Sequence, residues 1–156
     1  MKYSILFLFL VLMIACNRQE GSDQSKGDPD KAINDTIPLT RNQVQSGPVA
    51  AFSEKVEDPL NDWKFAVEVY ETKSTFDFLI KMTYMAMDVQ DTLKIPNFGI
   101  TPKVKIQKGP KERSCIIGFL DKTGAFKEYK LVEIKNNQLK ISTLKYYART
   151  RYKVKK

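Results

Sequence analysis

The sequence predicts an all-β protein: a β-sandwich or partly open barrel of about seven to eight short antiparallel strands, after a signal peptide and a disordered tether. Three observations predict this class. From Trp63 onward, apolar and polar residues alternate with a period of two. Turn residues recur about every 8–12 positions. No stretch after residue 50 has the pattern of an amphipathic helix.

The first half of the domain contains four expected strands. Segments 63–70 and 76–84 each alternate apolar with polar side chains, and the polar stretch 71–75 joins them as a turn. We expect the second of these strands to continue as far as Met87. Two shorter strands are expected over 91–95 and 103–107, each ended by a proline or glycine signal.

The second half begins with a nearly continuous apolar run over 113–120, which indicates a strand buried on both faces near the centre of a sheet. The turn signal 121–124 leads to a return strand over 125–134. The pair Asn136-Asn137 predicts another tight turn, followed by a strand over 139–144.

The last expected strand spans 146–154. Its alternation places Tyr146 toward the core and Tyr147 outward. Because alternate residues lie about 6.6 Å apart along a strand, the cations of its outer face would form a row of roughly 20 Å. The predicted binding face consists of Tyr147, Arg149, Arg151, Lys153 and Lys155.

The N-terminus has the pattern of a secretory signal peptide. Lys2 precedes an apolar run from Ile5 to Ile14, which is shorter than the about 20 residues of a membrane-spanning helix. The run ends in Met13-Ile14-Ala15-Cys16, which resembles the lipobox of bacterial lipoproteins, although Met stands where Leu is usual. The resemblance implies cleavage after Ala15, so that residues 1–15 are the signal peptide and Cys16 is lipidated, with palmitate among its acyl chains.

A lipidated Cys16 implies a membrane partner without any spanning helix, since each buried methylene contributes about 0.8 kcal/mol. Asn17 follows the cysteine. In many Gram-negative lipoproteins an Asp at this position favours the inner membrane, so the resemblance implies an outer-membrane anchor, with the domain facing the periplasm or the cell surface.

Residues 16–50 are expected to be the lipidated cysteine and a flexible tether, and residues 51–156 the basic β domain. Segment 17–50 lacks aromatic residues and shows no period, so it buries too little apolar surface to order itself. A coil of this length reaches about 30–35 Å. Residues 37–44 carry a weak signal for docking on the domain.

Asp35-Thr36-Ile37 resembles an O-glycosylation pattern of exported bacterial proteins, which makes Thr36 a candidate modification site. The same pattern recurs at Asp91-Thr92-Leu93. Three residues match by chance often, so ordinary turn and strand residues are the favoured explanation of both tripeptides, and the one at Asp35, in the expected tether, is the better candidate.

The composition argues against an enzyme. The chain has no histidine, which excludes Ser-His-Asp and Cys-His catalysis and the commonest zinc sites. Cys115 lies in an apolar strand and is expected to be a small buried hydrophobe rather than a nucleophile. No catalytic residue, metal site or cofactor is therefore predicted.

The positive charge is concentrated in the last third of the chain, where residues 101–156 carry 16 basic and 4 acidic side chains. The row of cations would attract an acidic ligand, although it could equally protect a strand edge against aggregation. The tyrosines among the cations would suit single-stranded nucleic acid, but an exported location disfavours that partner.

A lipidated cysteine, a polar tether and a small β domain resemble the small outer-membrane lipoproteins of secretion machines, type VI systems in particular. The resemblance is one of layout, and it implies a non-enzymatic adaptor that contacts envelope proteins of a membrane-associated complex. The alternative is a lipoprotein that binds an acidic glycan or lipid head group through its basic strand face.

Overall fold

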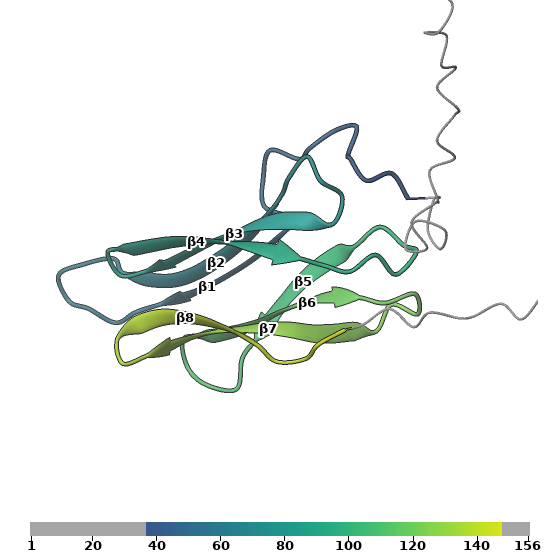
Figure 1. Cartoon of the computed structure of the whole chain (residues 1–156). Coiled ribbons are helices and arrows are strands. Elements are labelled where there is room, and N and C mark those ends of the chain that lie inside the picture. Colours follow the sequence, from purple (N-terminus) through teal and green to yellow (C-terminus); the bar gives the residue numbers. More distant parts are fainter. Residues whose placement is uncertain (1–36, 148–156) are drawn as a thin grey trace, which may run out of the picture. The chain divides into compact units, whose positions relative to one another are not determined.

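The computed structural model describes residues 37–147, and the whole of this part is built from strands and turns (Figure 1). Eight antiparallel strands form two four-stranded sheets. Sheet 1 contains β1 (Ala50–Lys55), β2 (Lys64–Glu71), β3 (Asp77–Tyr84) and β4 (Met87–Lys94). Sheet 2 contains β5 (Lys103–Lys108), β6 (Ser114–Leu120), β7 (Phe126–Lys135) and β8 (Gln138–Thr143).

Each sheet is a meander in which neighbours in sequence are neighbours in space, with the orders β1-β2-β3-β4 and β5-β6-β7-β8. Short turns between consecutive strands leave no room for a crossover, so antiparallel pairing follows. The two sheets lie one over the other (Figure 1) and share one buried core. The predicted β-sandwich is confirmed.

The core comes from the alternate residues that the sequence placed on the inner face. In sheet 1, Val67 pairs with Met82 and Val69 pairs with Ile80, and all four side chains are buried. Sheet 2 contributes Cys115, Ile117, Phe119 and Val132 from its two central strands. At about 1.5–3 kcal/mol per fully buried large apolar side chain, these residues supply most of the driving force for the sandwich.

The turn at the end of β3 differs from its prediction. The strand was expected to continue to Met87, but it ends at Tyr84, and Met85 turns the chain with a φ of 54°. Positive φ is uncommon in a non-glycine residue, so no turn signal marked this position. β4 consequently starts at Met87, four residues before the strand expected over 91–95.

The Asn136-Asn137 turn is confirmed. Both residues have positive φ, 53° and 58°, as the two-residue hairpin between β7 and β8 requires. Asparagine tolerates this conformation better than most residues because its short polar side chain bonds locally.

A bulge interrupts the pairing of β6 with β7. Ile117 pairs with Lys130, whereas the next residue, Gly118, pairs with Glu128. Tyr129 is therefore an extra residue on β7. Its ring packs edge-on against Phe119 at 6.1 Å, so the bulge brings an aromatic side chain to the end of the core.

The folded domain starts before residue 50, where the tether was expected to end. Arg41 fixes this segment: its side chain is 8% exposed, its Nε lies 3.2 Å from Oε1 of Glu71, and its guanidinium lies 4.6 Å from the ring centroid of Phe78. The same guanidinium donates hydrogen bonds to the backbone carbonyls of Thr72, Ser74 and Thr75. Residues 37–49 therefore belong to the domain, and β1 follows directly.

The C-terminal strand expected over 146–154 is not present in its described part. Tyr146 and Tyr147 lie outside any strand, and their orientation is the reverse of the prediction: Tyr146 is 89% exposed, whereas Tyr147 packs against the core. Four aromatic rings, one of them from Tyr147, cluster there in place of strand pairing. Residues 148–156 lie outside the described part of the chain.

Candidate functional site

The outer face of sheet 2 carries a group of apolar side chains that no other element covers in the described part of the chain. Ile116 pairs directly with Leu131, and Leu120 pairs with Phe126, so the four side chains lie together across the central strands. All four are half-buried. We call this group, with Gly118 between its two pairs, the apolar face.

Gly118 allows the apolar face to be flat. A Cβ atom at this position would collide with the backbone carbonyl of Lys127 and lie 2.6 Å from Cζ of Phe126. The ring of Phe126 therefore lies directly over the glycine. Only the absence of a side chain lets the ring lie down on the sheet at the bulge.

Lysines border the apolar face on the side of β5. Lys105 pairs with Gly118 and Lys103 pairs with Leu120, and both lysines are exposed. Within residues 37–147 neither has a carboxylate at ion-pair distance. The two carboxylates of this face are already neutralised, since Glu128 pairs with Lys145 at 2.8 Å and Glu133 pairs with Lys111 at 3.1 Å. The charge that remains available to a partner is positive.

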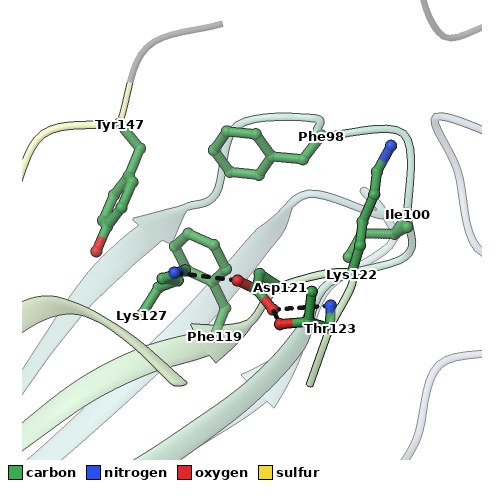
Figure 2. Close-up of a pocket in the computed structure, with 8 residues that line it drawn as sticks. All are labelled: Phe98, Ile100, Phe119, Asp121, Lys122, Thr123, Lys127 and Tyr147. Carbon is green, nitrogen blue, oxygen red and sulfur yellow. Dashed lines mark hydrogen bonds and ion pairs between the residues drawn. The ribbon is translucent and has the colours of Figure 1, made fainter. Parts of the chain in front are cut away.

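A second feature is a pocket of about 340 Å³ at the end of the sandwich where the chain passes from β4 to β5 (Figure 2). Three aromatic rings and Ile100 form its wall. The ring of Phe98 stacks on that of Phe119 with centroids 5.5 Å apart, and Tyr147 meets Phe119 edge-on at 5.2 Å. Such a wall favours an apolar or aromatic group.

The rim of the pocket is the β6–β7 turn. Asp121 accepts hydrogen bonds from the hydroxyl of Thr123 and from the backbone N–H groups of Thr123 and Ala125, and Lys127 lies 3.0 Å from its other oxygen. The Thr123 hydroxyl and then Lys127 hold the pKa of Asp121 well below its usual range. Lys122 extends away from this carboxylate beside Ile100 (Figure 2), so its charge remains free at the rim.

The hydroxyls of two tyrosines connect the pocket wall to both sheets through hydrogen bonds. Tyr147 donates to the carbonyl of Glu128 at 2.8 Å, and Tyr129 donates to the carbonyl of Lys94 at 3.0 Å. Burial, and next the neighbouring Tyr146, raise the pKa of Tyr129. Because both phenols donate to backbone carbonyls, they hold the pocket wall in place rather than offer free hydrogen-bonding groups to a ligand.

Of the binding face predicted from sequence, only Tyr147 lies in the described part of the chain. It lines the pocket wall instead of an exposed strand. Four of the predicted binding residues, the lipidation site and the glycosylation site lie outside the described residues; they are Arg149, Arg151, Lys153, Lys155, Cys16 and Thr36.

Cys115 is buried in the core, and burial raises the pKa of its thiol to about 12. A thiol in this state is a poor nucleophile. Between residues 37 and 147, no group of three or more side chains with metal-ligating chemistry comes together. The same residues include no helix of the length and apolarity that a membrane crossing requires.

Neither the apolar face nor the aromatic pocket was predicted from the sequence. The apolar run 113–120 predicted a strand covered on both faces, whereas Ile116 and Leu120 are half-buried on a side that no element of residues 37–147 covers. Phe98 lies in a loop that begins with Pro96-Asn97 and gave no periodic signal. A usable signal existed in Gly118, because a glycine inside a buried strand marks a bulge or a close approach.

No protein-family model, no curated protein and no solved structure matches this chain.

Proposed function

We propose that this protein is a lipid-anchored, non-enzymatic adaptor of the bacterial cell envelope, whose β-sandwich binds a partner protein through the apolar face of sheet 2. The observation that carries the proposal is this face itself: four half-buried apolar side chains on the outside of a sheet, on a chain whose first residues match a lipobox. Uncovered apolar groups bordered by polar residues mark interaction sites on small proteins.

The chemistry of the face defines the partner. Phe126 and its neighbours would fill the dry centre of an interface, where aromatic and aliphatic residues contribute most of the binding energy. Lys103 and Lys105 would lie at the rim opposite acidic residues. The expected partner therefore presents an apolar patch bordered by carboxylates.

The layout supports an adaptor within a membrane-associated complex. The lipobox, a segment of about twenty residues before the domain and a β-sandwich of roughly a hundred residues match the plan of secretion-machine lipoproteins of the type VI kind. In this proposal Asn17 directs the protein to the outer membrane, and the domain faces the periplasm or the cell surface.

A second function, the recognition of an acidic ligand, has support from a different observation. The aromatic pocket carries Lys122 at its rim, and because Lys127 is paired with Asp121, Lys122 is the cation that would meet an anionic group of an apolar ligand. Of the predicted binding face, this site uses Tyr147 alone, and its free cation is Lys122.

The experiment that tests the proposed function compares the native protein with the Cys16→Ala variant, each with a C-terminal tag. We expect labelled palmitate in the native protein and none in the variant, and only the native protein should fractionate with membranes. After crosslinking of intact cells, the native protein should recover a stoichiometric set of envelope proteins. Recovery of the protein alone would contradict the adaptor and shift support to the acidic ligand.

A further inference from the structure

The two ends of the sandwich differ in how their exposed lysines are paired. Residues 37–41 and the connections 72–76, 95–102 and 121–125 share one end, because Leu39 bonds to Thr75 and Ile37 lines a cavity of about 440 Å³ with Ile100 and Lys122. We call this the anchor end. The connections 56–63, 85–86, 109–113 and 136–137 share the other end, which we call the far end. At the far end Lys55, Lys108 and Lys111 form ion pairs, whereas at the anchor end no carboxylate of residues 37–147 pairs with Lys73, Lys94, Lys103 or Lys122.

The anchor end combines exposed cations with exposed apolar side chains. Leu39 is 69% exposed, although it lies beside the apolar cavity lined by Phe76 and Ile95. The aromatic pocket opens at this end as well, and it shares Ile100 with the cavity at Ile37. Four exposed lysines surround these openings: Lys73, Lys94, Lys103 and Lys122.

We propose that the anchor end rests on the anionic surface of the membrane that holds Cys16, with the lysines at lipid phosphates and the aromatic pocket taking an apolar part of the lipid. This inference rests on the proposed lipid anchor. Lysines beside an anionic bilayer contribute about a fivefold gain in affinity each. The aromatic and aliphatic side chains of the anchor end would enter the interfacial layer of the bilayer beside these lysines.

Chain connectivity favours a membrane over other acidic partners. Ile37 lines the cavity at the anchor end, so the segment that carries Cys16 joins the domain at this end. Even fully extended, residues 17–37 span at most roughly 75 Å, so a lipid at Cys16 keeps the domain within that distance of the bilayer. Such a link raises the effective concentration of the surface to about the millimolar range, where weak contacts suffice.

The chain offers a matched pair of positions to test this orientation. Leu39 at the anchor end and Leu60 at the far end are both exposed leucines, at 69% and 89%. Trp63 is the single tryptophan, so Trp63→Phe removes the background fluorescence. In that background, Leu39→Trp and Leu60→Trp report on the two ends. Neither position is in the core, but Trp63 packs against it, so the urea midpoint of the Trp63→Phe protein, followed by circular dichroism, is compared with that of the native chain first.

The probe is the lipidated protein in vesicles of equal parts phosphatidylglycerol and phosphatidylcholine, with bromine on the acyl chains as a quencher. We expect strong quenching of the Leu39→Trp reporter and little quenching of the Leu60→Trp reporter. Quenching that is equal at both positions, confined to Leu60→Trp, or absent from both would overturn the proposal. In the last case the domain stands off the bilayer.

Charge variants separate membrane docking from anchoring. Lys103→Glu with Lys122→Glu should reduce the Leu39→Trp quenching to the Leu60→Trp level, whereas Lys135→Glu with Lys140→Glu at the far end should leave it unchanged. Both proteins should still float with the vesicles, since the lipid holds them. Quenching that persists in the first double variant overturns the role given to the lysines, whereas a native chain that fails to float overturns the lipid anchor and docking together.

Discussion

The outer faces of the two sheets are built on the same alternation but present opposite chemistry. The outer face of sheet 1 is polar and satisfied internally: the hydroxyl of Tyr70 donates to Glu68 at 2.7 Å, and Nζ of Lys81 lies 4.6 Å from the ring centroid of Tyr70. The outer face of sheet 2 presents Ile116 paired with Leu131, with no comparable polar network over them.

The two sheets share the apolar residues of their inner faces, which determine the fold. They differ in the residues of their outer faces, which determine what each surface can bind. A sheet with one solvated face normally carries polar residues there, as sheet 1 does. Sheet 2 departs from that rule across its two central strands, β6 and β7. These side chains lie outside the shared core and pack only on one another across the strands, which is the arrangement that the proposed binding role would use.

The largest effect should come from placing a charge on the apolar face. Leu131 and Leu79 are matched, since each is a half-buried leucine on the outer face of an internal strand. Leu131→Glu should reduce the recovery of crosslinked envelope partners about tenfold or more, because an unpaired charge at the centre of an interface is costly. Leu79→Glu should change the recovery of crosslinked partners less than twofold, which is the size of effect expected for a residue outside the centre of an interface.

The control for this pair is the urea midpoint of each purified protein, which should fall by a similar small amount in both variants. Equal loss of partners in both variants would mean that the charge acts through stability and not through the apolar face.

The next largest effect should come from Arg41, which fastens the N-terminal segment to sheet 1. Arg41→Ala removes three hydrogen bonds to carbonyls and the ion pair with Glu71. Its loss should lower the free energy of unfolding by roughly 2–4 kcal/mol.

Arg41→Lys should rescue little of this stability, because an ammonium cannot reproduce the planar fork that serves the carbonyls of Thr72 and Thr75. Urea unfolding followed by Trp63 fluorescence measures both variants. A full rescue by lysine would show that charge alone matters at this position.

Gly118→Ala should destabilise sheet 2 near the bulge and leave the stability of sheet 1 unchanged. The added methyl group would force Phe126 off the sheet and press on the carbonyl of Lys127 at the bulge. We expect a loss of roughly 1–3 kcal/mol. Amide exchange should accelerate in β6 and β7 and stay unchanged in β2 and β3, and uniform acceleration across both sheets would contradict a local effect.

The smallest effect should come from Asp121 in the β6–β7 turn. Its pKa is lowered in the folded protein, so its contribution to stability is present above the unfolded pKa of about 3.9 and is lost as the pH falls toward the folded pKa. Asp121→Asn should therefore lower the urea midpoint at pH 7, and the gap to the native protein should narrow in acid. A gap that is the same at both pH values would assign the effect to turn geometry alone.

The sequence was informative where alternation was sustained and turns were marked. Seven of the eight strands follow from runs such as Phe76 to Tyr84, and the Asn136-Asn137 hairpin follows from residues that tolerate positive φ. β1 was missed because its segment, Ala50–Lys55, has only one large apolar side chain, Phe52. Pairing with β2 stabilises such a strand, and pairing is not visible in local pattern.

Both candidate surfaces were beyond sequence reasoning for a related reason. Whether Ile116 and Leu131 are covered depends on which elements pack outside sheet 2, and local hydrophobicity cannot distinguish a covered face from an uncovered one. The docking of Arg41 depends on carbonyls more than thirty positions later in the chain. The pocket joins Phe98 to Phe119, 21 positions later, and to Tyr147, 49 positions later.

The most direct test of the central claim is photo-crosslinking in living cells, with a photoreactive amino acid placed at Leu131 in one strain and at Leu79 in another. If sheet 2 binds the partner, position 131 should give a discrete adduct with an envelope protein and position 79 should give none. An adduct at position 79 alone, or at neither position in a protein that is folded and lipidated, would contradict the account.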